Sequence, residues 1–390
     1  MAFLTEKDRQ YKTPEDILAH VGDEYDKFLG AIVPPIFQNS LFVQGNEMNG
    51  VDSEGYHYSR VGNPTTSIVE RKVAALEGAD GALCFASGMA AISSAIMYFI
   101  RANCHIILVG TAYGCTTSFV ENYLAPKFNI EFTYVNGDTA EIEAAIRPNT
   151  ALIFLESPSS AVFRMQDLAA VAAIAKKHGV GTAIDGTYAT PLHQQPLKHG
   201  IDIVCHTASK YLGGHSDIVA GILAARREII ESIQGRELAL LGGCMDPHQA
   251  WLMLRGMRTM MVRLKQHGEN ALRVAKFLEN HPKVKKVFYP GSDTYEQKEL
   301  FNKYLTGLNG LMSFVPNGSE QEVKKAIASL HYFQNGCSWG GFESLCVYLG
   351  SNDKMRAFGQ PDNLVRIHVG LENADTLIAD LDQALSQLPD

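Results

Sequence analysis

A lysine set between hydroxyl side chains is the strongest chemical signal in the sequence. Lys210 ends the segment Thr207-Ala208-Ser209-Lys210, which follows the apolar run 201–205 and precedes a pair of glycines. An amine at the end of a buried strand is partly desolvated, which lowers its pKa and favours the neutral nucleophile. Such a lysine suits a Schiff base to a carbonyl compound. A loop lysine with incidental Ser and Thr neighbours is the alternative that this segment alone leaves open.

Two further groups also fall at the ends of apolar runs. Asp185 follows the run 179–184, where α/β sheets bind their ligands, and an acid there can pair with a protonated pyridine nitrogen. The turn 86–90 places Gly88 and Met89 between a run and an amphipathic segment, where backbone N–H groups bind phosphate. Each feature alone has a plain structural explanation. Together, in one domain, they predict a site for a pyridoxal ring and its phosphate.

A rival enzymatic hypothesis comes from a G-x-S-x-G match. The segment is Gly336-Cys337-Ser338-Trp339-Gly340, and Asp353 or Asp362 and then His368 follow it in the order nucleophile, acid, base. The segment does not lie between an evident strand and helix, and only 50 residues follow Gly340. A serine hydrolase using Ser338 is therefore the remote alternative.

The elements that must position these residues are predicted from hydrophobic periodicity. Near-continuous apolar runs alternate with amphipathic segments between residues 60 and 225, which predicts an α/β domain with buried parallel strands and helices on both faces. The predicted strands are 82–86, 106–109, 130–135, 151–155, 179–184, 201–205 and 219–224, and the predicted helices are 65–77, 89–100, 139–146 and 167–178.

The rest of the chain has a different texture. Residues 247–279 predict one long or broken helix that acts as a connector. Beyond it, strands at 284–288, 310–315, 344–348 and 364–369 and helices near 321–329 and 374–388 predict a second, smaller α+β domain. Residues 1–60 lack periodicity, as expected of a segment that wraps a partner or a site. The predicted division is 1–60 (N-terminal segment wrapping a neighbouring subunit), 61–245 (large cofactor-binding domain), 246–282 (connecting helix) and 283–390 (small domain).

Composition excludes several other classes. With 46% hydrophobic and 19% charged residues, the 390-residue chain can bury a large core, which excludes intrinsic disorder. A net charge of −8 supplies no basic surface for nucleic acid. Charged residues at positions 6–9 interrupt the first eleven residues, where an export signal would need an apolar run. The longest apolar stretch, 89–100, is too short to cross a bilayer, so we expect a cytoplasmic protein without a membrane span. Seven cysteines without a C-x-x-C pair argue against a zinc site or a disulfide framework.

Segments from about residue 34 to the C-terminus resemble a known family. It is the Cys/Met-metabolism PLP-dependent enzymes, which include cystathionine γ-synthase, cystathionine γ-lyase, cystathionine β-lyase and methionine γ-lyase. The matching segments are Pro34-Pro35-Ile36-Phe37-Gln38, Tyr58-Ser59-Arg60-Val61-Gly62-Asn63-Pro64-Thr65, Ser87-Gly88-Met89, Tyr113-Gly114, Glu156-Ser157-Pro158, Asp185, Ser209-Lys210-Tyr211, and Val365-Arg366-Ile367 with Val369-Gly370-Leu371-Glu372. The resemblance implies the α/β fold of the fold-type-I PLP-dependent transferases (aminotransferase-like), with a mixed, mostly parallel seven-stranded sheet and a smaller C-terminal α+β domain. It also implies a homotetramer of two active dimers.

The resemblance implies a set of residues that bind pyridoxal 5'-phosphate. Lys210 would carry the cofactor as a Schiff base and shuttle protons, Asp185 would pair with the pyridine nitrogen, and Tyr113 would stack on the ring with its phenol near the substrate. The phosphate contacts implied are Gly88, Met89, Thr207 and Ser209 from the same subunit, and Tyr58 and Arg60 from the neighbouring one.

The resemblance also implies how a sulfur amino acid would be held. Arg366 would bind the substrate α-carboxylate with its planar guanidinium fork. Ser338 and the backbone of Trp339 would assist, so the G-x-S-x-G match would belong to a glycine-rich substrate loop. Ser160 stands where most of the family has an Asn close to the cofactor's phenolic oxygen.

Residues around the expected site resemble β-lyases at some positions and γ-enzymes at others, so they do not decide whether the Cβ–S or the Cγ–S bond breaks. Ser160 and the segment 338–344 look like bacterial cystathionine β-lyases, whereas Tyr58, Met89 and Cys115 resemble the γ-enzymes. The first reading is a PLP-dependent carbon–sulfur lyase of the cystathionine β-lyase type, which converts L-cystathionine to homocysteine, pyruvate and ammonia. The alternative is a γ-elimination or γ-replacement enzyme of the same family. Gly186 replaces the family's usual Asn, which leaves open how Asp185 is supported.

Overall fold

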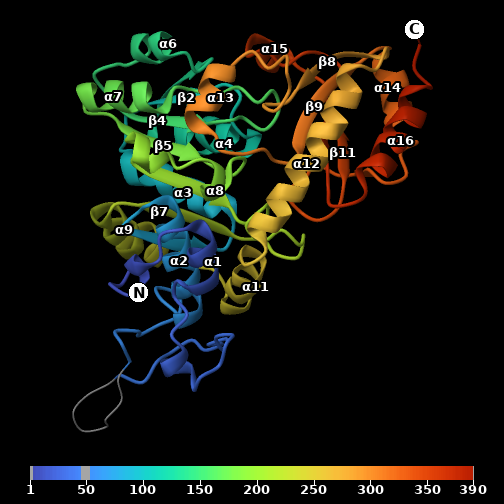
Figure 1. Cartoon of the computed structure of the whole chain (residues 1–390). Helices are drawn as coiled ribbons and strands as arrows, with labels where there is room; N and C mark the ends of the chain where they lie inside the picture. Colours follow the sequence, from blue (N-terminus) through green and yellow to red (C-terminus); the bar gives the residue numbers. More distant parts are fainter. Residues whose placement is uncertain (1–2, 45–52, 390) are drawn as a thin grey trace.

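The computed structural model describes residues 3–44 and 53–389 and centres on a seven-stranded sheet (Figure 1). The strands are β1 (Gly81–Phe85), β2 (His105–Val109), β3 (Glu131–Val135), β4 (Thr150–Glu156), β5 (Gly181–Asp185), β6 (Ile203–Thr207) and β7 (Gly221–Ala225). Their order is β1-β7-β6-β5-β4-β2-β3, with β7 antiparallel to both neighbours and every other pair parallel. The mixed, mostly parallel seven-stranded sheet is therefore confirmed, and each predicted strand moved by at most two residues at either end.

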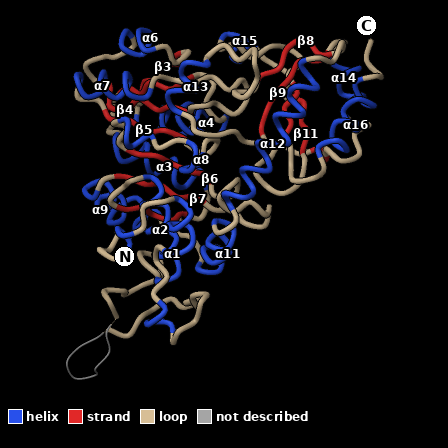
Figure 2. Tube along the Cα trace, viewed as in Figure 1, coloured by secondary structure: helices blue, strands red, loops and turns tan. Residues whose placement is uncertain are grey.

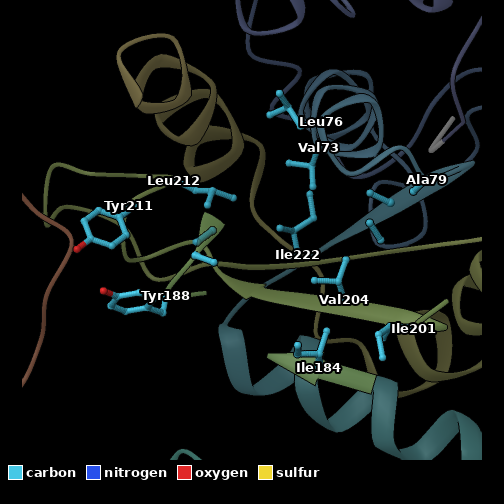
Figure 3. Close-up of a cluster of buried hydrophobic side chains, with 14 of the residues drawn as sticks. Val73, Leu76, Ala79, Ile184, Tyr188, Ile201, Val204, Tyr211, Leu212 and Ile222 are labelled. Carbon is cyan, nitrogen blue, oxygen red and sulfur yellow. The ribbon is translucent and has the colours of Figure 1, made fainter. Parts of the chain in front are cut away.

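Helices cover both faces of this sheet, and α2 (Pro64–Glu77) shows why they form. The Asn63 side chain accepts a hydrogen bond from the Thr65 N–H, and the helix ends at Gly78 with a φ of 67°. Val73 points from α2 toward the strands in Figure 3, and Leu76 is buried in the same cluster. Burying each such side chain contributes about 1.5–3 kcal/mol, so packing on the sheet fixes the position of α2.

The remaining helices of this part complete the two layers. They are α3 (Gly88–Phe99), α4 (Gly114–Ser118), the π-helix η3 (Phe119–Leu124), α5 (Ala125–Phe128), α6 (Thr139–Ala144), α7 (Leu168–His178), α8 (Thr190–His193), the 3-10 turn η4 (Pro196–His199), α9 (Arg227–Ile233), the π-helix η5 (Gln234–Leu238) and α10 (Ala239–Leu241). The helical stretches 114–128 and 227–241 were not predicted.

Two helices, α11 (Pro247–Met257) and α12 (Met260–Glu279), form the connector. The predicted long helix is broken at residues 258–259, where the Arg263 guanidinium donates to the Gly256 and Tyr211 carbonyl oxygens. A Cβ atom on Gly256 would lie 2.1 Å from the Gly213 carbonyl oxygen. This close approach holds α11 against the loop that follows Lys210.

A second sheet forms the core of the C-terminal part, on the far side of α12 (Figures 1 and 2). Its strands are β8 (Val284–Phe288), β9 (Leu311–Pro316), β10 (Gln334–Asn335), β11 (Leu345–Tyr348) and β12 (Val365–His368), in the order β10-β11-β12-β9-β8. The helices are α13 (Lys298–Tyr304), α14 (Glu320–Ile327), α15 (Asp353–Ala357) and α16 (Ala374–Leu385). The smaller α+β unit is thus present, and β12, which carries Arg366, lies at the centre of its sheet.

The N-terminal part has little regular structure and extends away from the body in Figure 1. It contains η1 (Asp8–Gln10), α1 (Pro14–His20) and η2 (Tyr25–Phe28). Leu29, Ile32, Leu41 and Val43 are exposed on it. The predicted wrapping segment includes residues 45–52, which lie outside the described residues, and the exact four-part division remains a prediction. Among the described residues, no helix is both long and apolar enough to cross a membrane.

Candidate active site

The carboxyl ends of three parallel strands bring the predicted cofactor residues to one edge of the large sheet. β4 ends at Glu156, β5 at Asp185 and β6 at Thr207. Glu156 and Asp185 are register partners, and Asp185 pairs in register with Cys205. The Thr187 hydroxyl joins two of these strand ends, because it donates to Asp185 Oδ1 and accepts from the Thr207 N–H at 2.8 Å.

Lys210 lies in the turn after β6 and contacts the C-terminal part of the chain. Its Nζ atom donates to the Ser338 hydroxyl at 2.7 Å and lies 5.4 Å from the centre of the Trp339 ring. Burial lowers the pKa of the Lys210 amine, and the positive charge of Arg366 lowers it further. A lowered pKa favours the neutral amine, the form that attacks a carbonyl and accepts a proton.

Asp185 presents a buried carboxylate at the same edge. The Thr187 backbone N–H donates to its Oδ1 atom at 2.9 Å, and the Thr187 hydroxyl also donates to Oδ1. Both bonds use one oxygen, which leaves Oδ2 to accept a proton from a ligand. Burial raises the pKa of Asp185, while the bonds from Thr187 and the charges of His206 and Lys210 lower it.

The start of α3 forms a close-packed cradle. Ser87 caps the helix by accepting from the Ala90 N–H at 3.1 Å. A Cβ atom on Gly88 would lie 2.0 Å from Thr207 Oγ1 and one on Gly221 would lie 2.2 Å from the Ser87 carbonyl oxygen. Only glycine fits at these positions. The free N–H groups at the first turn of α3, beside the Thr207 hydroxyl, suit a phosphate group.

Tyr113 is held over this edge by a buried acid. Its backbone N–H donates to Glu156 Oε2 at 2.6 Å, and its half-exposed ring remains accessible. A hydrogen bond with the Cys115 thiol, with burial adding, raises the pKa of the Tyr113 phenol to about 12. The phenol therefore keeps its proton near neutral pH and can act as a donor.

Arg366 reaches the site from β12. Its guanidinium donates to the Ser160 carbonyl oxygen at 3.0 Å and to the Cys337 carbonyl oxygen at 2.6 Å. The Ser160 N–H in turn donates to Glu156 Oε1 at 2.8 Å. The guanidinium is thus fixed in orientation by two backbone oxygens, which suits a carboxylate-binding fork.

The serine hydrolase hypothesis is wrong. Ser338 lies in the loop between β10 and β11, not in a strand-to-helix turn, and its hydroxyl bonds to Lys210. His368 Nε2 accepts from the Gly340 N–H at 3.1 Å rather than facing Ser338. The histidine fixes the loop, so the motif match has no catalytic geometry.

The other predicted site residues fall into two groups. Met89 and Ser209 lie with the cradle, since Met89 follows Gly88 in α3 and the Ser209 hydroxyl accepts from the Ala220 N–H at 3.0 Å. Tyr58 and Arg60 lie elsewhere: Arg60 stacks on the Tyr58 ring and donates to the Ala239 carbonyl oxygen in α10. The described contacts of this chain do not join them to the Lys210 edge, and their role at a neighbouring subunit's phosphate remains a prediction.

Glu156 is a site residue to which sequence reasoning assigned no role. The available signal was an acid at the end of a predicted buried strand, the same signal that singled out Asp185. Its two oxygens hold the loop of Tyr113 and the loop of Ser160. Burial, with the negative charge of Asp185 adding, raises the pKa of Glu156 to about 8. Hydrogen bonds from the Ser160 side chain and from the Tyr113 and Ser160 N–H groups lower this pKa in turn, and through them Glu156 acts as a brace between the two loops.

Replacing Glu156 with glutamine should loosen both loops. Glutamine has a single acceptor oxygen, so its amide NH₂ group must face one of the two backbone N–H donors, at a cost of about 1–3 kcal/mol. We expect the thermal midpoint to fall and kcat/KM to fall by about tenfold. Differential scanning calorimetry and steady-state kinetics measure both. Glu143→Gln, on the surface beside Lys177, is the control, and wild-type values for Glu156→Gln would show that the brace is unimportant.

These residues fit pyridoxal phosphate on structural grounds. The edge offers a lysine amine of lowered pKa, a buried acid with one free oxygen, and a glycine-lined helix start in one place. Within residues 3–44 and 53–389, no group of three or more His, Cys, Asp or Glu side chains could hold a metal ion.

Comparison with known proteins identifies the family. The model of the Cys/Met metabolism PLP-dependent enzymes matches residues 15–386. The chain is 38% identical to an L-methionine gamma-lyase of Porphyromonas gingivalis, over 94% of this chain and 96% of that protein. It is 37% identical to a cystathionine gamma-lyase of Bacillus subtilis, over 95% of this chain and 99% of that protein. The crystal structure of metB from Corynebacterium glutamicum superposes with a TM-score of 0.90 at 34% identity, over 97% of this chain and 98% of that one. The chain therefore belongs to the Cys/Met metabolism PLP-dependent enzymes, and it has their fold-type-I architecture, their cofactor and their carbon–sulfur lyase chemistry.

Proposed function

We propose that this enzyme is a γ-lyase, which cleaves the Cγ–S bond of a sulfur amino acid such as L-methionine or L-cystathionine. The products are 2-oxobutyrate, ammonia and a thiol. The Porphyromonas gingivalis and Bacillus subtilis relatives are named as γ-lyases, and they favour this alternative over the β-lyase reading that the sequence placed first.

The observation that carries the choice of bond is the similarity to γ-lyases, and the placement of the Lys210 amine supports the chemistry. Lys210 Nζ lies at the Asp185 edge, within reach of the substrate loop through Ser338. Bound pyridoxal phosphate supplies the electron sink for charge that develops at Cα. γ-Elimination needs proton transfer at Cα and then at the adjacent Cβ, and a flexible lysine amine can serve both carbons. Arg366 orients the substrate by binding its α-carboxylate, and the Glu156 brace holds Tyr113 opposite.

Tyr113 is the proposed proton donor to the departing thiolate. Its pKa of about 12 keeps the phenol protonated, and the Cys115 thiol orients it. An acid at this position lowers the barrier for loss of the sulfur group.

The residues that favoured a β-lyase contribute contacts that do not select the bond to be broken. Ser160 contacts Glu156 through its side chain and its backbone N–H, and its carbonyl oxygen accepts from Arg366. These contacts hold the loop and do not depend on which carbon–sulfur bond is cleaved. Trp339 is buried against Tyr188 and Tyr211, beneath Lys210. Its packing supports the lysine, and this role is independent of whether Cβ–S or Cγ–S breaks.

The keto acid released from L-cystathionine tests the proposal directly. A γ-lyase gives 2-oxobutyrate and cysteine, and we expect that product in at least about tenfold excess, since a barrier difference of 1.4 kcal/mol suffices. Chromatography of the derivatised keto acids after reaction of the cofactor-loaded protein gives the ratio. Release of 2-oxobutyrate from L-methionine is the companion assay. Pyruvate and homocysteine as main products would restore the β-lyase reading.

The assembly proposed is a homotetramer of two active dimers. The N-terminal part exposes Leu29, Ile32, Leu41 and Val43, and a protein chain gains stability by covering such apolar side chains. Tyr58 and Arg60 on the same part carry polar groups that a second subunit could receive. In this proposal they complete the phosphate site of the neighbouring chain.

A further inference from the structure

A buried pair of ionisable side chains lies behind the candidate active site. His206 Nε2 and Glu77 Oε1 are 2.5 Å apart, and the two side chains are 1% and 0% exposed. Their remaining polar atoms, His206 Nδ1 and Glu77 Oε2, are buried without a hydrogen-bond partner among the described residues. Burying such groups is costly unless they are paired. Neither side chain has a role in the proposed γ-lyase reaction.

The position of Glu77 favours a charged pair. Glu77 is the last residue of the 14-residue helix α2, where the helix dipole disfavours an anion and favours a cation. A carboxylate there is stable only beside a positive partner, and a protonated imidazole also benefits from the helix end. The contact with His206 therefore places a hydrogen-bond donor, and a cation when the imidazole is protonated, beside the carboxyl group at this helix end.

The imidazole is packed directly against the strand end that carries Asp185. Val204 points toward α2 in Figure 3, and His206, two residues further along β6, shares that face. A Cβ atom on Gly186 would lie 3.0 Å from His206 Cε1 and 3.5 Å from Nδ1. The Gly186 N–H also donates to the Cys205 carbonyl oxygen at 2.8 Å. His206 and Asp185 lie on opposite faces of the sheet, because His206 shares the face of Val204 whereas Asp185 shares the face of Ala183 and Cys205, so the imidazole lies behind the strand end that carries Asp185.

The charged groups around Asp185 indicate how the Glu77–His206 pair would affect its carboxylate. Burial raises the pKa of the Asp185 carboxyl, whereas the Thr187 hydrogen bonds, the charge of His206 and the charge of Lys210 lower it. Glu156, its register partner on β4, is a second buried acid that competes with it for ionisation. Of the two side chains whose charges lower the pKa of Asp185, Lys210 would bind the cofactor, whereas His206 takes no part in that contact.

We propose that Glu77 and His206 are positioning residues that hold a positive charge behind Asp185, keeping its carboxylate ionised and thereby keeping the pyridine nitrogen of pyridoxal phosphate protonated. The inference rests on the proposed role of Asp185 but not on which carbon–sulfur bond is cleaved.

The test reads the pyridine nitrogen itself. The holoenzyme is reconstituted with pyridoxal phosphate labelled with ¹⁵N in the ring, and the ¹⁵N chemical shift is recorded without substrate. Wild type should show a protonated nitrogen. Glu77→Gln and His206→Gln should move the shift toward the deprotonated value and weaken cofactor binding by about tenfold, the effect of a shift of one pKa unit. Glu77→Asp, which keeps the charge, should restore the wild-type shift.

His105→Gln is the matched control. His105 is equally buried in the same sheet, on β2, but it bonds to Thr150 and Thr133. It should lower stability without moving the ¹⁵N shift. Asp185→Asn tests the role of Asp185 separately from the role of the Glu77–His206 pair. If Asp185→Asn changes the ¹⁵N shift but the folded variants Glu77→Gln and His206→Gln do not, the inference about the pair is overturned and the role of Asp185 stands. If Asp185→Asn leaves the shift unchanged, the role of Asp185 fails and the inference fails with it.

A measurement on the wild-type chain keeps the proposal testable if the variants do not fold. Histidines labelled with ¹⁵N report whether one or both ring nitrogens carry a proton, and the His206 signals are assigned by their sensitivity to apo–holo exchange against the His105 reference. Both nitrogens of His206 should be protonated at pH 7. A neutral His206 would overturn the proposal.

Discussion

Replacing Lys210 with alanine should reduce turnover of every sulfur amino acid by at least about 10³-fold. Loss of a proton-transferring group costs 10²–10⁴ in rate, and loss of a covalently bound nucleophile adds to this. The reason lies in the position of Nζ, which bonds to Ser338 and lies close enough to both Asp185 and Arg366 to feel their charges. Stopped-flow or discontinuous assays of 2-oxobutyrate and pyruvate together measure the loss, whichever bond is cleaved.

Mass spectrometry distinguishes a missing attachment point from a collapsed site. After borohydride reduction, the wild-type peptide that contains Lys210 should gain the mass of the reduced cofactor, and Lys210→Ala should gain none. Lys177→Ala, at a surface ion pair with Glu143, is the control and should match wild type in both assays. Turnover by Lys210→Ala at wild-type rate would show that the lysine scheme is wrong.

The strands could be predicted well because their information is local. β2, β4 and β6 are buried on both faces and read as continuous apolar runs. The helical stretch 114–128 could not be predicted, because it begins with Gly-Cys-Thr-Thr-Ser, which are poor helix formers, and continues through a π-helical turn. Tertiary packing of Val120 and Leu124, both fully buried, stabilises a helix that propensity does not favour.

The site residues that could be predicted are those that follow an apolar run in the sequence. Lys210, Asp185 and Gly88 each follow an apolar run, and parallel strands bring such ends to the same edge. The partners of these residues depend on contacts between distant parts of the chain. Arg366 is oriented by backbone oxygens of Ser160 and Cys337, which no side-chain pattern encodes. The Glu77–His206 pair spans 129 positions and forms no motif, so only the folded sheet reveals it.

Replacing Arg366 with leucine should lower kcat/KM by about 10²–10³-fold, mainly through KM. Removing one member of a buried charge pair typically costs 2–5 kcal/mol. The substrate carboxylate takes no part in bond breaking, so its contact is equally strong before and during the reaction, and its loss raises KM more than it lowers kcat. Arg366→Lys keeps the charge but cannot present two parallel donors, and it should fall between wild type and Arg366→Leu.

A comparison of two inhibitors separates carboxylate binding from general damage to the site. L-Alanine carries the α-carboxylate and ethylamine lacks it, so wild type should bind L-alanine much more tightly, and Arg366→Leu should nearly abolish that preference. Arg273→Ala, an exposed arginine paired with Asp375 on the small domain, should leave the preference intact. If Arg366→Leu kept the wild-type ratio of inhibition constants while losing activity, the guanidinium would serve only to tie Ser160 to Cys337, and the carboxylate would have to be bound by another cation. Lys210 is committed to the cofactor in this scheme, so such a result would revise the substrate site as a whole and not Arg366 alone.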